Sequence, residues 1–270
     1  MQIRAAGKTD RGLRRKTNQD YILVSPELGL FVIADGMGGH VAGEVASRLA
    51  VETMGDYWQK VRGGNPPPFL HRVHDDLPEE AKHLINSISL ANSIIHEAQK
   101  KPEYHSMGTT ISAILVEGDC FWCANVGDSP VYVCDRGRLV QISEEHSVEA
   151  EQRSLGRGDT WSSTNPMLKN ILTRALGIRE TVKIYITPVR PEPGDYLLIC
   201  SDGLTNYVSE PLIQDILNES SISIQRKVDR LVNEANKHGG GDNISVIILE
   251  ILKERKWRRL RKTFFDRDGS

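Results

Sequence analysis

The chain has 270 residues, 39% of them hydrophobic, and a formal net charge of -2 at pH 7. This length can bury a sizeable core, and because no Pro/Gly/Ser-rich linker or repeat divides the chain, we expect one domain. The charge argues against a general nucleic-acid binder. The sequence has no apolar stretch of about 18 residues and no secretory signal at its start, so we expect a cytoplasmic protein without a transmembrane segment.

The first half of the chain predicts a hairpin followed by two helices. DYILVS (20–25) and LFVIAD (30–35) are apolar runs separated by the turn-forming PELG, which is typical of a β-hairpin. Apolar residues at helical spacing predict helices from Ala42 to about Trp58 and from Leu77 to about Lys100. The stretch RGGNPPPF breaks the chain between them.

The second half predicts more strands and two further helices. Residues 109–143 contain four short β-branched runs separated by turn sequences, which predicts an antiparallel meander. From residue 145 to 170 the pattern is polar and irregular, so we expect a mobile loop near the functional site. VKIYITPV, GDYLLICSD and NISVIILEIL predict strands, with helices at about 208–219 and 222–237 between the last two. Without regular βαβ alternation, this order favours an α+β layered domain.

The sequence predicts that the four cysteines are core residues. Cys120, Cys123, Cys134 and Cys200 all lie inside or beside apolar runs. Alternation along a strand places Cys120 and Cys123 on opposite faces, which argues against a shared zinc ion. We therefore predict four small buried side chains.

Isolated acids stand at the ends of apolar runs. Asp35 ends FVIAD and is followed by Gly36, Asp202 ends YLLICSD, Asp128 follows FWCANVG, and Asp242 directly precedes NISVIIL. Each alone could be a turn residue that caps local amides, but the joint pattern is harder to explain in that way. If the strands lie side by side, the carboxylates meet and need cations. An all-oxygen ligand set selects Mg²⁺ or Mn²⁺ over Zn²⁺.

A basic run precedes the hairpin. TDRGLRRKTNQD (9–20) places Arg14, Arg15 and Lys16 ahead of Asp20. Taken alone, such a run is more simply a solvated surface. Beside a site for divalent cations, however, an arginine fork suits a phosphate group, because guanidinium binds two phosphate oxygens at once. The combination favours a phosphate-ester hydrolase.

Seven motifs in order carry a family resemblance: RKTNQD, FVIADGMGGHVAGEVAS, SMGTTISAIL, CANVGDSPVYV, LTRALG, GDYLLICSDGLTNYV and GGDNISVIIL. From about residue 3 to 251 the chain resembles the metal-dependent protein phosphatases, the type 2C serine/threonine phosphatases, most of all bacterial members. The resemblance implies a four-layer αββα sandwich of two central antiparallel sheets flanked by helices, with a flap subdomain at about 145–170. It assigns 1–252 to the phosphatase domain and leaves 253–270 as a basic tail.

The resemblance also implies metal ligands. Asp35 would bridge two tightly bound Mn²⁺ or Mg²⁺ ions, the Gly36 carbonyl would bind the second, and Asp202 with Asp242 would bind the first. Asp20 would support the second ion through water. Asp128 with Asp202 matches the pair that holds a third, weaker ion in bacterial relatives.

Substrate-handling residues follow from the same motifs. Arg15 matches the family's phosphate-binding arginine, and its neighbour Arg14 is the weaker candidate. Met37 stands where many eukaryotic members have the histidine assigned as general acid, and Met cannot donate a proton. His40 could help instead, although a capping or packing role is equally open, and water bound to a metal ion is another source of the proton.

The implied function is direct hydrolysis of phosphoserine and phosphothreonine in proteins by a water molecule that two cations activate. The expected partners are phosphoproteins and a cognate bacterial serine/threonine kinase, and a monomer is expected. A phosphoesterase for small metabolites and an inactive phosphoprotein-binding module stay open as alternatives. The tail, with Trp257, Phe264 and Phe265, could contact anionic lipid, nucleic acid or an acidic partner, or could simply be a solvated end.

Overall fold

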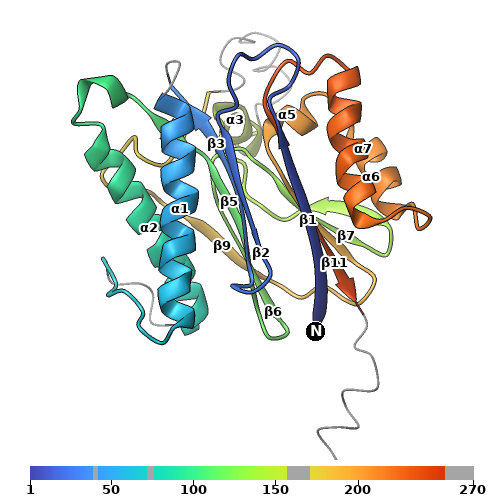
Figure 1. Cartoon of the computed structure of the whole chain (residues 1–270), viewed down its shortest axis with the longest axis horizontal. Helices are drawn as coiled ribbons and strands as arrows, with labels where there is room; N and C mark the ends of the chain where they lie inside the picture. The colour runs from blue at the N-terminus through green and yellow to red at the C-terminus, as the bar shows by residue number, and fades with distance from the viewer. Residues whose placement is uncertain (39–41, 72–75, 157–170, 253–270) are drawn as a thin grey trace, which may run out of the picture.

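The computed structural model describes residues 1–38, 42–71, 76–156 and 171–252, and these form two antiparallel β-sheets between two layers of helices (Figure 1). In order across the first sheet, the strands are β1 (Gln2–Asp10), β11 (Ile244–Leu252), β10 (Tyr196–Cys200), β7 (Val131–Asp135) and β8 (Arg138–Gln141). In the second they are β2 (Asp20–Ser25), β3 (Leu30–Met37), β5 (Ile111–Glu117), β6 (Cys120–Val126) and β9 (Tyr185–Val189), and β4 (Gly108–Thr109) pairs with β3.

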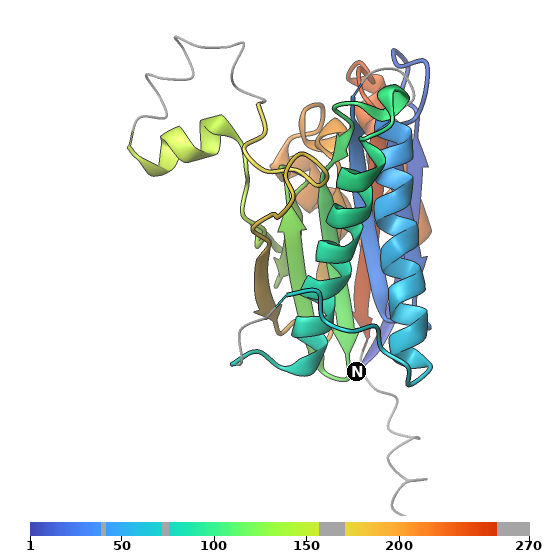
Figure 2. The same ribbon diagram turned by 90° about the vertical axis from the view of Figure 1, so that its left-hand side faces the viewer.

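Helices cover the outer faces of both sheets (Figure 1). The second sheet is covered by α1 (Ala42–Arg62) and α2 (Glu79–Ala98), and the first by α6 (Glu210–Asn218) and α7 (Ile224–Lys237). A short α5 (Asp202–Thr205) follows β10, a 3₁₀ turn η1 (Pro102–Tyr104) precedes β4, and α3 (Val148–Ser154) stands apart from the sandwich (Figure 2). The predicted α+β, four-layer αββα architecture is confirmed.

The core has three apolar layers, and this explains why central strands such as β3, β10 and β11 are apolar almost throughout. Phe31 and Ile33 face the layer between the two sheets, whereas Leu30 and Val32 on the same strand face α1 and α2. Because successive strand side chains point to opposite faces, a strand that is buried on both sides needs apolar residues at every position.

One sequence expectation about topology was wrong. The runs in 109–143 do not form a single meander, because β5 and β6 pair in one sheet and β7 and β8 pair in the other. The chain changes sheet at 127–130, where Gly127 has a φ of 112° that favours glycine. Turn residues mark where strands end, but they do not say which sheet the next strand joins. The N-terminal strand β1 and the short α5 were not predicted, and α3 lies within 145–170, where an irregular loop was expected.

The cysteine prediction is confirmed for Cys123, Cys134 and Cys200, which are buried, whereas Cys120 is only partly buried. Cys123 faces the layer between the sheets, and Cys120 on the same strand packs against the layer under α1 and α2. Cys134 and Cys200 are buried under α6 and α7, and all four thiols are free. In the described part of the chain, no helix is both long and apolar enough to cross a bilayer.

Candidate active site and metal centre

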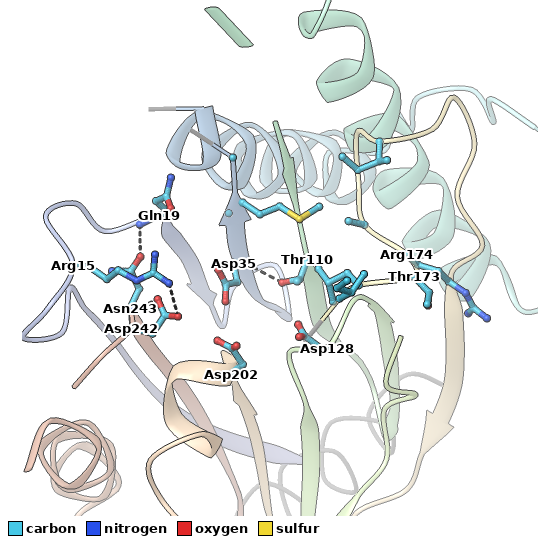
Figure 3. Close-up of a pocket in the computed structure, with 17 residues that line it drawn as sticks. Arg15, Gln19, Asp35, Thr110, Asp128, Thr173, Arg174, Asp202, Asp242 and Asn243 are labelled. Atoms are coloured by element: carbon cyan, nitrogen blue, oxygen red, sulfur yellow. Dashed lines mark hydrogen bonds and ion pairs between the residues drawn. The ribbon is translucent and has the colours of Figure 1, made fainter. Parts of the chain in front are cut away.

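An acidic cavity of about 660 Å³ opens at one edge of the sandwich (Figure 3). Asp35, Asp128, Asp202 and Asp242 line it, with Arg15 at one end. Strands β3 and β6 run in the same direction, because both are antiparallel to β5, whereas β10 and β11 are antiparallel to each other. The end of β3, the end of β6, the end of β10 and the start of β11 therefore meet at the same edge.

Asp35 and Asp20 are directly paired across β2 and β3. Asp20 is buried, and its Oδ2 accepts hydrogen bonds from Ser201 Oγ at 2.9 Å and Ser245 Oγ at 2.6 Å. Burial raises the pKa of Asp20 to about 6, although the two serine hydroxyls oppose the shift. Burial raises the pKa of Asp35 well above its ordinary value, and the charges of Asp20 and Asp202 raise it further.

Asp202 and Asp128 form the other side of the acidic group. Asp202 opens α5, and its Oδ2 accepts a hydrogen bond from Asn206 Nδ2 at 3.1 Å. Burial and the charge of Asp242 raise the pKa of Asp202. Asp128 follows Gly127 in the connection between the sheets, and burial together with the charge of Asp202 raises its pKa to about 7. Without a bound cation, burial and the neighbouring charges therefore favour the protonated forms of these carboxyl groups.

Arg15 reaches this group from the loop between β1 and β2. Its Nη2 donates to Asp242 Oδ2 at 2.7 Å, and its side chain is 50% exposed. The hydrogen bond to Asp242 raises the pKa of Arg15. Arg14, the alternative candidate for binding phosphate, does not line the cavity. Its backbone N–H donates a hydrogen bond to Gly240 O at 3.2 Å.

Polar residues that the sequence reasoning missed hold these acids in place. Thr110 Oγ1 accepts from the Asp35 N–H at 3.1 Å and shares a hydrogen bond of 2.8 Å with Ser129 Oγ. Asn243 accepts from the Gln19 N–H at 2.8 Å through Oδ1. Its Nδ2 donates to the carbonyls of Arg11 and Thr17 at 2.9 Å each. Both residues lie inside recognised motifs, SMGTTISAIL and GGDNISVIIL, but only the fold reveals their long-range partners.

Two positions beside the acids must be glycine, because neighbouring backbone passes too close to them to leave room for a side chain. A Cβ on Gly36 would lie 2.0 Å from the carbonyl oxygen of Gly43, and one on Gly203 would lie 1.8 Å from that of Asn243. Real Cβ contacts are never so short, so both Asp-Gly pairs let the acid-bearing segments pack against neighbouring backbone.

The wall opposite Arg15 is formed by residues 171–178, which include Arg174 (Figure 3). Arg174 Nη1 lies 3.4 Å from Glu144 Oε1 and 2.7 Å from Nε2 of the buried His146. Met37 also lines the cavity. His40 and most of the predicted flap, from 157 to 170, lie outside the described residues, as does the tail.

The donor set fits hard divalent cations. Oδ1 of Asp20 and Oδ1 of Asp202 are buried without a hydrogen-bond partner, which is costly unless a cation or water binds there. Among the described residues, no three His, Cys, Asp or Glu side chains are already grouped at metal-binding distances. Asp242 Oδ2 is instead hydrogen-bonded to Arg15 Nη2 at 2.7 Å. Oxygen donors and repelling carboxylates together suit Mg²⁺ or Mn²⁺.

Comparisons with known proteins agree with this geometry. Residues 12–239 match the family model described as protein phosphatase 2C. The serine/threonine phosphatase stp of Listeria welshimeri is 35% identical over 251 residues, which cover 92% of this chain and 96% of that protein.

Two solved structures extend the comparison to the fold. The serine/threonine phosphatase PstP/Ppp of Mycobacterium tuberculosis superposes with a TM-score of 0.80 at 29% identity, covering 93% of this chain and 99% of that one. The catalytic domain of PstP in complex with 2 manganese ions gives 0.76 at 30% identity, with the same coverage of 93% and 99%. The chain therefore belongs to the protein phosphatase 2C family.

Proposed function

We propose that the acidic cavity is the active site and that it removes phosphate from phosphoserine and phosphothreonine side chains of proteins by direct attack of water. The chain is a metal-dependent serine/threonine protein phosphatase, as its family and its relatives indicate. The observation that carries the proposal is the meeting of Asp35, Asp128, Asp202 and Asp242 around one cavity that also contains Arg15.

We assign the metal ligands as follows. Asp35 would contact both of two ions, the Gly36 carbonyl the second, and Asp202 and Asp242 the first. Asp20 would act through water, and Asp128 with Asp202 would hold a third, weaker ion. Bound Mn²⁺ or Mg²⁺ would supply a water of lowered pKa and would offset the negative charge that develops on the phosphoryl oxygens.

The chain's own residues would position the substrate. The exposed fork of Arg15 can turn from Asp242 to phosphate oxygens and so orient the phosphoryl group for in-line attack. Met37 cannot protonate the leaving serine or threonine oxygen, so that proton would come from water, or from His40 outside the described residues. Cys200 is buried and its raised pKa keeps the thiol protonated, so we assign it no nucleophilic role.

The oligomeric state, the location, the opposing kinase and the domain bounds are also part of the proposal. We propose a monomer in the cytoplasm that opposes a serine/threonine kinase, with a phosphatase domain over 1–252 and a separate tail at 253–270. Pull-down with liposomes and with partner proteins, by the full chain and by a version that ends at Leu252, tests whether the tail binds lipid or a partner.

Phosphate release tests the proposed substrate class. Phosphoserine and phosphothreonine peptides should be hydrolysed with Mn²⁺ and not with EDTA, at a higher kcat/KM than small metabolite phosphates. Faster turnover of the small phosphates would favour the metabolite phosphoesterase instead. Binding of phosphopeptides without any release of phosphate would favour an inactive binding module.

A further inference from the structure

A second cavity continues the active site on the side away from Arg15. It has a volume of about 540 Å³. It shares the lining residues Leu172, Thr173, Arg174, Ala175 and Ile178 with the acidic cavity, so the two cavities adjoin along this segment. We call the second cavity the side groove. A polypeptide whose phosphorylated side chain enters the acidic cavity can therefore extend along the side groove.

The charge of the side groove is opposite to that of the active site. Arg174, Arg179 and Lys183 line it, against the single carboxylate of Glu151 on α3. Arg174 lies near Glu144, so part of its charge is already balanced. Arg179 and Lys183 are exposed, and neither forms an ion pair with a residue that the structure describes. Two unpaired cations in a depression attract anions.

The backbone that carries these cations is fixed to α2. The buried Asn92 donates from Nδ2 to the carbonyls of Arg179 at 3.1 Å and Glu180 at 2.9 Å, and its Oδ1 accepts from the Gly177 N–H at 2.8 Å. His96 Nδ1 lies 2.8 Å from the Gly177 carbonyl oxygen. A fixed backbone lowers the entropy lost on binding, because only the two side chains must become ordered.

We propose that the side groove binds the substrate polypeptide next to its phosphorylated residue and selects acidic or phosphorylated side chains there, through Arg179 and Lys183. This deepens the proposed function and rests on it. The carboxylates of the acidic cavity favour cations, whereas Arg179 and Lys183 of the side groove favour acidic side chains beside the phosphorylated residue.

The test uses phosphothreonine peptides of equal length with Glu residues before the phosphothreonine, Glu residues after it, or Gln at all of these positions. With Mn²⁺, at least one Glu peptide should show a kcat/KM roughly fivefold above that of the Gln peptide, mostly through KM. Arg179→Gln combined with Lys183→Gln should remove this preference. High salt should weaken the preference in the unmodified chain, since exposed charges are screened.

Controls separate this inference from the proposed function. Lys60→Gln combined with Arg138→Gln removes the same charge from exposed positions that line neither cavity, and it should keep the preference. Hydrolysis of p-nitrophenyl phosphate, which is too small to reach the side groove, should be unchanged in both double variants. Equal kcat/KM for all three peptides, or an equal loss of preference in the two double variants, would overturn the inference. Absence of any Mn²⁺-dependent hydrolysis would overturn the proposed function instead.

Discussion

Arg15 Nη2 donates a 2.7 Å hydrogen bond to Asp242 Oδ2, and this pair joins the loop before β2 to the start of β11. Arg15 is half exposed and Asp242 is 27% exposed, so the contact lies at the mouth of the cavity, where a ligand can compete for either partner. A cation at Asp242 and an anion at Arg15 would together replace this ion pair. Under the proposed assignment, metal binding at Asp242 and phosphate binding at Arg15 should therefore favour each other.

Replacing Arg15 should weaken substrate binding. Arg15→Lys keeps the charge but loses the two-pronged guanidinium, so kcat/KM for a phosphopeptide should fall roughly 10- to 100-fold. Arg14→Lys is the matched control, because Arg14 does not line the cavity and its backbone N–H donates to Gly240 O, which is unaffected by the change. Steady-state kinetics at saturating Mn²⁺ measure both. Equal losses in the two variants would remove Arg15 from its assigned role.

Mn²⁺ should stabilise the folded chain. Burial, and after it the charges of neighbouring carboxylates, raise the pKa of Asp35, and bound cations would offset both costs of keeping these groups ionised. At a free Mn²⁺ concentration of about 100 times Kd, the free energy of unfolding should rise by about 2.7 kcal/mol. Thermal unfolding with Mn²⁺ and with EDTA measures the effect, which should be smaller in Asp202→Asn. A Tm that is the same with and without Mn²⁺ would argue against the metal assignment.

Gly203 should not tolerate a side chain. Gly203→Ala places a Cβ 1.8 Å from the Asn243 carbonyl oxygen, so the free energy of unfolding should fall by about 3 kcal/mol. Gly55→Ala is the matched control on α1, where the nearest atom is Leu23 Cδ2 at 3.7 Å. It should raise the free energy of unfolding by up to about 1 kcal/mol, because alanine favours helix. Similar effects from both changes in denaturant unfolding would contradict the close approach.

His146 should make stability fall in acid. Its Nδ1 accepts from the Gly127 N–H at 3.0 Å, and burial together with Arg174 lowers its pKa from 6.5 to about 4. The unfolded chain therefore binds more protons than the folded one. The stability that His146 contributes is complete above pH 6.5 and is lost as the pH falls to about 4.

His146→Gln isolates this contribution. Denaturant unfolding in EDTA at several pH values across that window should show a weaker loss of stability in the variant than in the unmodified chain. EDTA in both samples keeps the contribution of the acidic cavity the same. An unchanged pH dependence would mean that His146 titrates as it does in the unfolded chain.

Much of the fold could be predicted because local patterns determine it. The hairpin at 20–35 and α1 follow from apolar periodicity and a turn sequence, and both occur where expected. The change of sheet between β6 and β7 could not be predicted. Both β6 and β7 are buried on their two faces, so their sequences do not show which sheet each strand joins.

Some residues of the candidate site could likewise be predicted from the sequence, and others could not. Asp35 and Asp202 were predictable because they interrupt apolar runs next to glycine. Asn243 and Thr110 were not predictable as supports, since their hydrogen bonds reach segments that are distant in sequence. The cations of the side groove follow only from the course of residues 171–183 beside the cavity.

Mn²⁺-dependent phosphate release by Asp35→Asn and Asp202→Asn, compared with the unmodified chain, tests the central claim most directly. Asp56→Asn, an exposed change on α1, is the matched control. The account predicts that both cavity variants lose Mn²⁺-dependent release while their circular dichroism spectra stay native, and that Asp56→Asn keeps full activity. Near-normal turnover in both Asp35→Asn and Asp202→Asn would contradict it.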